Sequence, residues 1–259
     1  MRAVYGPVET GQLGRVLGVD LVASQRKYCS FDCSYCQSAK RTHGVARRRW
    51  FVGLSALQAA LEEEVSRGAD CVAFSGMGEP TLASNLAEAI DMAKSILGLP
   101  VAVCTNSSLM PMEEVRRDLC KADLVVAKLD APNEELYQRI NRPFVPYSHA
   151  EILAGLEQFR QRYSGRLALQ VTFVEANASC AEEMAAIAAR LSPNEVQLNT
   201  PLERQLQLSV AEVERLRTNF TDHKTTTVYE AQAAKREPFS LSLPPLRPNA
   251  GVMLMAWGS

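Results

Sequence analysis

Three cysteines lie within eight residues of the chain, and their thiolates could bind metal. Three residues separate Cys29 from Cys33, two separate Cys33 from Cys36, and Tyr35 directly precedes the last cysteine. A structural zinc site normally has four protein ligands, and an iron–sulfur cluster normally has a cysteine on each iron. Three cysteines are one ligand too few for either. The spacing therefore predicts a metal centre completed by another group, or a zinc site completed by a distant side chain such as His43.

A second group of polar residues follows the short apolar stretches of the chain. Gly76 and Gly78 could let the backbone approach a ligand closely, and the Glu79 carboxylate could bind an ammonium group. Polar side chains after further apolar stretches could line a site for a nucleoside, although residues of these types also occur in ordinary turns. They are Asn106, Lys128, Asp130 and Asn199.

Basic residues are concentrated around the cysteines. Residues 26–49 contain seven Lys and Arg side chains and a single acid, Asp32. Such a segment could bind RNA phosphates, a phosphorylated metabolite or a carboxylate, or it could be a solvated loop. No series of aromatic residues accompanies it to suggest stacking on unpaired bases. The candidates for substrate contact are Arg47, Arg48 and Arg49.

Six short apolar stretches alternate with helical segments, and this alternation determines where the polar residues lie. It predicts a parallel sheet of right-handed βα units, in which ligands bind at the carboxyl ends of the strands. Because no Rossmann glycine pattern follows the first stretch, the sequence favours a partial (β/α)6 barrel of the α/β class, with an open doubly wound sheet as the alternative. The predicted strands are residues 15–22, 70–74, 100–104, 124–128, 167–174 and 195–198.

Helix starts are indicated by a serine followed three residues later by Gln or Glu. The serine side chain can bond the backbone of the first helical turn, and the amide or acid can bond back to the serine backbone. Each such pair predicts the start of an amphipathic helix. The pairs are Ser55/Gln58, Ser148/Glu151, Ser179/Glu182 and Ser209/Glu212.

The domain organisation follows from length and from the two ends of the chain. A length of 259 residues suits one α/β barrel or two smaller domains, and no linker divides the chain. We expect an irregular N-terminal arm over residues 1–15 and a barrel over residues 16–230. Residues 231–259 are expected to form an irregular C-terminal tail, because their prolines exclude regular helix through most of it.

The composition is that of a folded globular protein, with 47% hydrophobic and 22% charged residues. A formal net charge of −1 gives no overall argument for binding nucleic acid or a membrane. The chain shows neither a secretory signal nor an apolar run of about 18 residues, so we expect a cytoplasmic protein. In that reducing compartment cysteines serve as metal ligands or buried thiols. Four cysteines without ligand spacing are expected to be packing residues: Cys71, Cys104, Cys120 and Cys180.

Two of these motifs resemble those of a known family. The stretch Cys29–Cys36 resembles the cluster motif of the radical S-adenosylmethionine (radical SAM) superfamily. Gly76–Pro80 is similar to the Gly-Gly-Glu motif of that superfamily, with Met77 in place of the first glycine. The resemblance covers about residues 5–230. Further stretches resemble the branch that contains wyosine-type tRNA(4-demethylwyosine) synthases: residues 14–20, 75–82, 128–131 and 140–143.

The resemblance implies a radical SAM enzyme with one cluster. Cys29, Cys33 and Cys36 would hold three irons of a [4Fe-4S] cluster, and the amino and carboxylate groups of S-adenosylmethionine would bind the fourth. An electron from the cluster would cleave S-adenosylmethionine to methionine and a 5′-deoxyadenosyl radical, which abstracts a hydrogen atom from the substrate. Gly78 and Glu79 would receive the methionine amino group. The other implied cofactor contacts are Tyr35 beside the adenine, and Gly76, Asn106, Asp130 and Asn199.

These residues do not identify the substrate. The resemblance and the basic segment suggest tRNA or another phosphorylated or anionic molecule, with a reductant such as flavodoxin or ferredoxin as a partner and no membrane. The alternatives are a peptide- or protein-modifying enzyme or activase, and a non-catalytic iron–sulfur electron carrier or metal-binding regulator. Lys128 is a candidate catalytic residue that could form a Schiff base with a keto substrate, or it could form an ion pair with Asp130 or Glu79.

Overall fold

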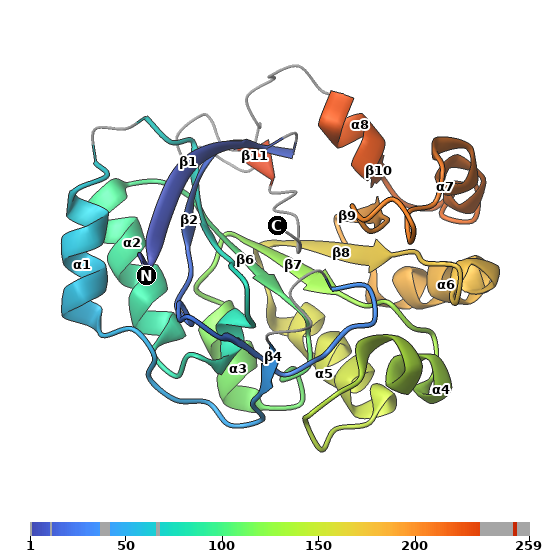
Figure 1. Ribbon diagram of the computed structural model, residues 1–259, viewed down its shortest axis with the longest axis horizontal. Coiled ribbons are helices and arrows are strands. Elements are labelled where there is room, and N and C mark those ends of the chain that lie inside the picture. The colour runs from blue at the N-terminus through green and yellow to red at the C-terminus, as the bar shows by residue number, and fades with distance from the viewer. Residues whose placement is uncertain (1, 11, 37–41, 66–67, 234–250, 253–259) are drawn as a thin grey trace.

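The centre of the molecule is a curled β-sheet (Figure 1). The computed structural model describes residues 2–10, 12–36, 42–65, 68–233 and 251–252. Apart from the central sheet, β3 and β4 form a separate two-stranded ribbon. The strands are β1 (Val4–Thr10), β2 (Gln12–Val19), β3 (Lys27–Cys29), β4 (Thr42–Gly44), β5 (Cys71–Phe74), β6 (Val101–Thr105), β7 (Leu124–Lys128), β8 (Arg166–Thr172), β9 (Glu195–Asn199), β10 (Thr225–Thr227) and β11 (Gly251–Val252).

The central sheet is open and mostly parallel. Its hydrogen-bonded order is β1-β2-β5-β6-β7-β8-β9-β10, and β11 also pairs with β2. Within this order, all strands from β2 onward run parallel to one another, whereas β1 and β11 are antiparallel to β2. No pairing within the described ranges joins β10 to β1, so the sheet is a half-barrel. The predicted α/β fold with a partial radical SAM-type barrel is thereby confirmed.

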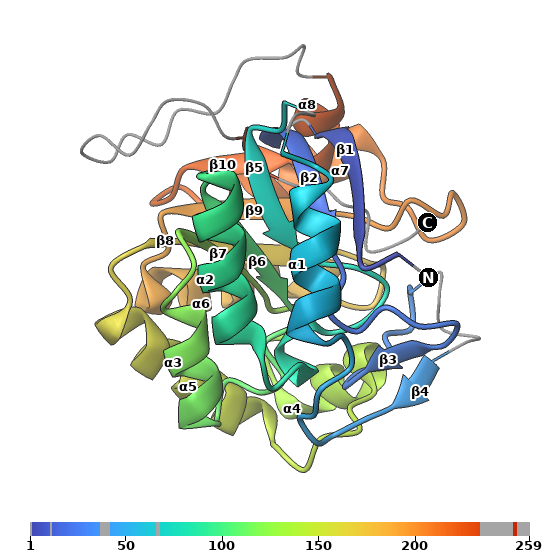
Figure 2. The same cartoon turned by 90° about the vertical axis from the view of Figure 1, so that its left-hand side faces the viewer.

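Helices pack on the outer side of this sheet (Figures 1 and 2). They do so because each has one apolar face; Ile90 of α2 and Met184 of α6 are fully buried, for example. The main hydrophobic core lies between these faces and the strands. The helices are α1 (Leu54–Glu62), α2 (Leu86–Leu97), α3 (Glu113–Leu119), α4 (Glu134–Leu136), α5 (His149–Arg162), α6 (Ala181–Leu191), α7 (Val210–Arg217) and α8 (Val228–Ala233), with short turns η2 (Pro80–Leu82), η3 (Tyr137–Asn141) and η4 (Ala178–Cys180).

All six predicted strands are present, as β2 and β5 to β9. β2 is shifted toward the N-terminus and ends at Val19, because the chain turns there toward the cysteines. β10 is a further parallel strand that the sequence did not reveal. Its three threonines carry no apolar pattern, and they become a strand only by pairing with Val196–Leu198 of β9.

The expected irregular arm at residues 1–15 is wrong for most of its length. Val4–Thr10 form β1, which pairs with β2 as an antiparallel edge strand. Gly6 and Pro7 suggested irregular chain, but the pairing register shifts between Tyr5 and Val8, and such a bulge accommodates both residues. An edge strand also tolerates proline, since only one of its sides must pair.

Two of the four predicted helix starts are confirmed. Ser148 and Ser209 form complete capping boxes at α5 and α7. The other two predictions are wrong: α1 begins after Gly53, which places Ser55 inside its first turn, and α6 begins after Cys180. The turn η4 takes up Ser179 before α6 starts, so its hydroxyl does not cap the helix.

The predicted C-terminal tail lies largely outside the described residues. Its first part, residues 231–233, is helical as the end of α8, and residues 251–252 form β11. The boundaries proposed at residues 16 and 230 stay predictions. None of the described helices combines the length and the apolar character that crossing a bilayer requires.

Candidate active site

The cysteine loop lies at the end of the sheet where the parallel strands finish (Figure 2). Backbone hydrogen bonds attach it to two segments that are distant in sequence. Val45 N donates to the Cys29 carbonyl at 3.0 Å, and Ser34 N donates to the Ile140 carbonyl at 2.8 Å. These bonds fix the direction of the loop between β4 and η3. These bonds hold the cysteine loop against the rest of the fold.

Each of the three sulfur atoms accepts a hydrogen bond from a different side chain. Asn106 Nδ2 donates to Cys29 Sγ at 3.6 Å, and Asn141 Nδ2 donates to Cys33 Sγ at 3.6 Å. Lys27 Nζ donates to Cys36 Sγ at 2.9 Å. N–H donors favour sulfur in its thiolate form, which is the form that binds metal. The donor set around these cysteines thus fits anionic, metal-ligating sulfur.

Burial acts against that thiolate form while no metal is bound. It raises the pKa of the Cys29 thiol to about 12 and that of Cys33 to about 11. A bound metal would have to displace these protons, since the thiolate is the ligand. The donors and the metal together therefore stabilise a charge that the protein interior alone disfavours.

Lys27 is a site residue that the sequence analysis counted only as part of the basic segment. Its side chain is buried, with 3% of its surface exposed. Burial lowers the pKa of Lys27, but the neighbouring Cys29 and Cys36 sulfurs outweigh burial and leave the pKa raised. A signal for this role was present: Lys27 and Cys29 are two residues apart in β3, and such residues share one face of a strand.

The two glycines of the Gly76–Pro80 stretch are required by contacts inside the protein. A Cβ atom on Gly78 would lie 2.0 Å from the Tyr28 carbonyl oxygen, and one on Gly76 would lie 2.2 Å from Asp20 Cγ. Glu79 N also donates to the Tyr28 carbonyl at 3.1 Å. The glycine motif thus lets the end of β5 pack directly against β3, the strand that carries the first cysteine.

The Glu79 carboxylate is enclosed by protein donors. One oxygen accepts bonds from Thr81 N at 3.0 Å, Thr81 Oγ1 at 2.6 Å and Thr105 Oγ1 at 2.7 Å. The other accepts from Asn106 N at 2.7 Å. Its side chain is fully buried, and burial raises its pKa despite these bonds. In this arrangement Glu79 positions Asn106, the donor to Cys29, and its second oxygen accepts a single bond. Contact of Glu79 with the methionine amino group stays a prediction.

Asp130 is the centre of a second buried network. Its Oδ2 accepts from the Tyr35 hydroxyl at 2.6 Å and from Asn141 Nδ2 at 3.0 Å. Its Oδ1 accepts from Thr172 N at 2.8 Å and lies 3.3 Å from Lys128 Nζ. Tyr35, expected beside an adenine, is thus tied to the end of β7. The ion pair that the sequence allowed for Lys128 is present.

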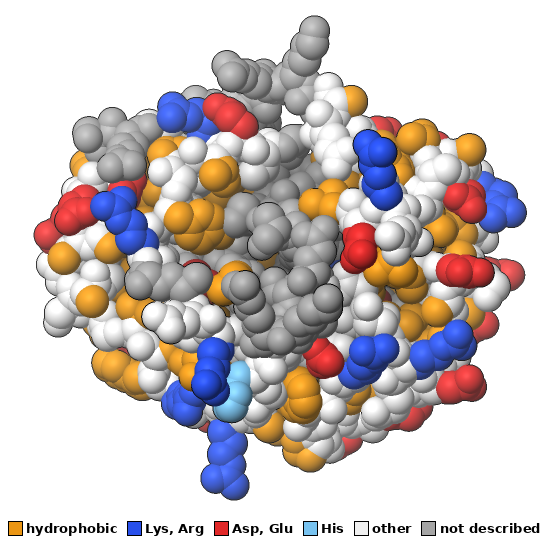
Figure 3. All heavy atoms as spheres, in the orientation of Figure 1, with side chains coloured by type: hydrophobic (Ala, Val, Ile, Leu, Met, Phe, Trp, Pro, Cys, Tyr) orange, Lys and Arg blue, Asp and Glu red, His pale blue; other side chains and the backbone are white. Residues whose placement is uncertain are grey.

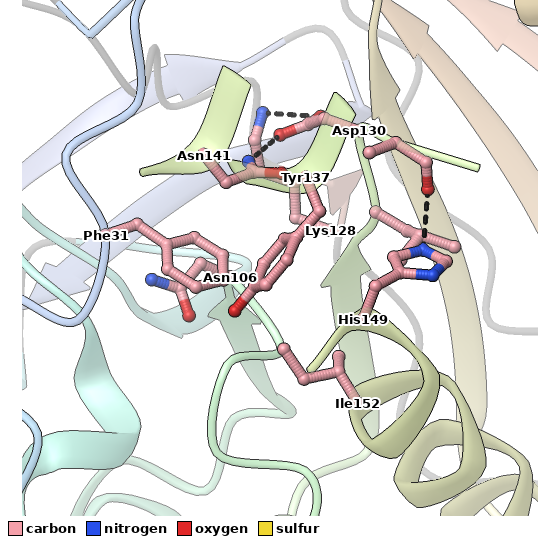
Figure 4. A pocket seen from close by; sticks show the side chains of 10 residues that line it. Phe31, Asn106, Lys128, Asp130, Tyr137, Asn141, His149 and Ile152 are labelled. Atoms are coloured by element: carbon pink, nitrogen blue, oxygen red, sulfur yellow. Dashed lines mark hydrogen bonds and ion pairs between the residues drawn. The ribbon is translucent and has the colours of Figure 1, made fainter. Parts of the chain in front are cut away.

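A small pocket adjoins both networks (Figure 4). Phe31 from the cysteine loop, Asn106 from the end of β6 and Tyr137 from η3 face one another across it. Asn106 and Asn141, which donate to two of the cysteine sulfurs, both line this pocket. The pocket itself is small, with a volume of about 10 Å³, which is about the space of one water molecule.

Asn199 is a predicted contact that still has an unused acceptor. Its Oδ1 is buried and has no hydrogen-bond partner among the described residues. Asn199 ends β9 opposite Thr172 of β8, which itself bonds Lys128. A buried amide oxygen of this kind is suited to a ligand N–H or hydroxyl group.

Comparison with known proteins identifies the family to which this chain belongs. Residues 27–188 match the family model of the radical SAM superfamily. The chain belongs to the radical SAM superfamily. The chain is therefore an enzyme, and the superfamily implies a [4Fe-4S] cluster and S-adenosylmethionine as cofactors. Enzymes of this superfamily also need a reductant.

Two similar proteins carry a family name without an activity. The chain is 34% identical over 211 residues to a UPF0026 protein of Synechocystis, covering 79% of each chain. It is 34% identical over 210 residues to a UPF0026 protein of Methanocaldococcus jannaschii, covering 78% of this chain and 64% of the relative. These radical SAM relatives therefore do not identify a substrate.

Solved structures show the same fold at low sequence identity. TYW1 with a bound lysine–pyruvate adduct matches with a TM-score of 0.63 at 17% identity, over 81% of this chain and 74% of TYW1. Streptococcus suis SuiB bound to S-adenosylmethionine matches with a TM-score of 0.62 at 15% identity, over 80% of this chain and 50% of SuiB. The similarity confirms the radical SAM fold, and TYW1 is one of several neighbours in it.

The basic segment around the radical SAM cysteines separates into buried and exposed residues. Arg48, a predicted substrate contact, has partners within the protein: its guanidinium bonds the Thr81 and Ala83 carbonyls and pairs with Asp118 at 2.5 Å. Arg47 and Arg49 are exposed. Lys40 and Arg41 lie outside the described residues.

Aromatic side chains accompany the exposed arginines, contrary to the sequence analysis. The Arg49 guanidinium lies 5.0 Å from the Tyr28 ring centroid and 4.7 Å from that of Phe51. Trp50 is 60% exposed and Phe144 is 46% exposed. Phe144 packs on Gly44 of β4 and its N–H bonds the Ser30 carbonyl, so this surface is continuous with the cysteine loop. Figure 3 shows Lys and Arg side chains gathered beside a histidine in the region of β4.

The remaining cysteines do not form a second metal site in the described part of the chain. Cys71 and Cys104 are buried in β5 and β6, as predicted. Cys120 is exposed, so it is not the packing residue that its helix position suggested. Within the described ranges no three His, Cys, Asp or Glu side chains are arranged to hold a metal ion, and Cys29, Cys33 and Cys36 are no exception. The cluster is therefore assigned through the radical SAM family match.

Proposed function

We propose that the chain binds a [4Fe-4S] cluster through Cys29, Cys33 and Cys36 and cleaves S-adenosylmethionine reductively. When bound, these groups supply a 5′-deoxyadenosyl radical that abstracts a hydrogen atom from the substrate. The observation that supports this best is the set of three cysteine sulfurs, each with its own side-chain donor. The family match favours this function over that of a simple electron carrier.

The chain's own residues have distinct tasks in this proposal. Asn106 and Asn141 orient the sulfurs of Cys29 and Cys33 through their side-chain hydrogen bonds. Glu79 holds the Asn106 backbone, and Gly78 keeps the loop against β5. The Asn199 amide oxygen, Tyr35 and Asp130 remain proposed cofactor contacts, of which Asn199 has the free acceptor.

Product formation tests the proposal. The anaerobically reconstituted full chain, reduced with dithionite, is expected to convert S-adenosylmethionine to 5′-deoxyadenosine. Cys33→Ala should lose this activity, whereas Cys120→Ala, at an exposed cysteine away from the loop, should retain it. A wild-type protein that holds a full cluster but forms no 5′-deoxyadenosine would instead support the electron-carrier alternative.

The proposed substrate is a polyanion such as tRNA, bound at the surface formed by Arg47, Arg49, Trp50 and Phe144. Exposed arginines can bind phosphates, and exposed aromatic rings can stack on unpaired bases. This surface touches the cysteine loop through Phe144. A peptide substrate is the alternative, but it gives no reason for arginines to flank the aromatic side chains.

The salt dependence of binding tests whether the substrate is a polyanion. A tRNA transcript should bind the wild type with an affinity that falls steeply as salt rises, and Arg47→Glu with Arg49→Glu should weaken binding and reduce the slope by about two. Arg190→Glu, at an exposed arginine of α6, is the matched control and should leave the slope unchanged. If the wild type shows no salt-sensitive affinity for tRNA, the peptide alternative is favoured.

A further inference from the structure

Lys27 is a buried cation that the described part of the chain does not neutralise. Only 3% of its surface is exposed, and no ion pair joins it to a carboxylate within the described ranges. Its polar partner is Cys36 Sγ, 2.9 Å from Nζ. An ammonium group without a counter-charge is strongly unfavourable in a protein interior. The position of Lys27 therefore indicates that negative charge is present on the sulfur side.

The cysteine sulfurs are the source of negative charge that Lys27 reaches. Its Nζ lies 2.9 Å from Cys36 Sγ, and Lys27 shares one face of β3 with Cys29. The neutral donors Asn106 and Asn141 each reach one sulfur, at 3.6 Å. Lys27 differs from them because it is charged and lies closer to its sulfur.

We propose that Lys27 is a positioning residue whose charge raises the reduction potential of the cluster bound by these cysteines. The proposal rests on the cluster assigned above. In the relevant step, a low-potential reductant such as flavodoxin or dithionite gives one electron to the cluster, whose net charge becomes more negative by one. A fixed positive charge beside the sulfurs stabilises that reduced form more than the oxidised form. Lys27 thereby eases electron entry without touching the substrate.

A redox titration of the full-length, reconstituted protein tests this role. The signal of the reduced cluster is followed by electron paramagnetic resonance against a set of low-potential dyes, without substrate. At the midpoint potential of the wild type, Lys27→Gln should lower the ratio of reduced to oxidised cluster about tenfold, which is about 59 mV for one electron. Lys27→Arg keeps the charge and should stay within about twofold. Lys121→Gln removes an exposed lysine that pairs with Asp91, and it should match the wild type.

Other results of these experiments would also support or overturn the proposed role of the Lys27 charge. If Lys27→Gln and the wild type titrate together, the proposed role of the charge is wrong. If Lys27→Gln folds normally by circular dichroism but holds no iron, retention of the cluster in Lys27→Arg supports the need for charge, and loss of the cluster in both variants overturns it. The titration needs no turnover, so a wild type that binds the cluster but forms no 5′-deoxyadenosine contradicts the proposed function and leaves the Lys27 result readable.

Discussion

Two buried lysines of this protein have different surroundings. Lys128, at the end of β7, lies 3.3 Å from Asp130 Oδ1, bonds Thr172 and sits 4.8 Å from the centroid of the Tyr35 ring. Lys27, in β3, has Cys36 Sγ as its polar partner. Both are more than nine-tenths buried, with exposed fractions of 6% and 3%. The protein alone completes the surroundings of Lys128, whereas those of Lys27 are completed by charge on the cysteine sulfurs.

The difference distinguishes Lys128, which stabilises the fold, from Lys27, which is proposed to act on the cofactor. Asp130 links the cysteine loop, through Tyr35, to β7 and β8, and it needs the Lys128 charge whether or not a cluster is bound. Lys27 has no comparable partner within the described residues until the sulfurs are ionised. Variants of the two lysines should therefore respond differently to the presence of the cluster.

The largest effect is expected for Lys128→Met. The substitution leaves the buried Asp130 carboxylate without its cation, which should lower the free energy of unfolding by about 3–5 kcal/mol in cluster-free protein. Urea denaturation followed by circular dichroism measures this. Lys121→Met, at a lysine that is half exposed in its pair with Asp91, should leave the value close to that of the wild type. Equal effects of the two substitutions would mean that the Lys128 pair does not support the fold.

A smaller loss is expected for Gly78→Ala, which separates β3, the strand of Lys27, from the end of β5. The new methyl group meets the Tyr28 carbonyl at 2.0 Å, so the loop must shift. Such overpacking costs about 1–3 kcal/mol in unfolding experiments, and the iron content after reconstitution should fall as well. Gly53→Ala is a fitting control, since no atom lies within 4 Å of the place that its new methyl group would take. Normal iron content in Gly78→Ala would show that this contact does not position the cysteines.

Lys27→Met, in contrast to Lys128→Met, is not expected to destabilise the cluster-free protein. Removing a buried cation that lacks a carboxylate should leave the free energy of unfolding unchanged or raise it by about 1 kcal/mol. The same urea experiment, run beside Lys128→Met, gives the comparison directly. A loss of several kcal/mol in Lys27→Met would place both lysines in the same structural class and remove the distinction drawn above.

The smallest effect on stability is expected for His149, a third buried base, whose ring contacts a backbone carbonyl. Its ring nitrogen Nε2 lies 2.8 Å from the Ala131 carbonyl, and burial lowers its pKa below the usual value. The unfolded chain therefore binds the proton more readily, so folding stability should fall as the pH drops through about 6.5, the pKa of an unperturbed histidine. His149→Gln should flatten that part of the stability curve. An unchanged slope between pH 7 and pH 5 would show that His149 is not the group responsible.

Local patterns in the sequence predicted most of the sheet and the metal ligands. The six strands were visible because buried parallel strands are continuous apolar runs, and the spacing of Cys29, Cys33 and Cys36 is a local property of one loop. Two predictions were wrong because the same local sequence pattern is compatible with more than one structure. Val4–Thr10 became a strand through a bulge, and Ser55 was placed inside a helix and not at its start.

The functions of individual polar residues were harder to predict, because they depend on partners from other strands. Glu79 looked like a free carboxylate, yet Thr81, Thr105 and Asn106 bond both of its oxygens. Arg48 looked like one of three equivalent arginines, yet it is buried against Asp118. The exposed aromatic side chain beside the basic segment, Phe144, comes from a stretch about a hundred residues later in the chain.

The sequence by itself determined which cofactor chemistry this chain supports and which sheet carries it, because both are set by short-range patterns of thiols and apolar residues. Only the tertiary structure decided which polar groups are already satisfied and which are not. That distinction depends on contacts between residues as distant as Cys33 and Asn141, or Lys128 and Thr172. The role of Lys27 depends on the tertiary structure in the same way, since it becomes visible only when the side chain is seen to be buried and bonded to a sulfur, without an ion pair to a carboxylate among the residues described.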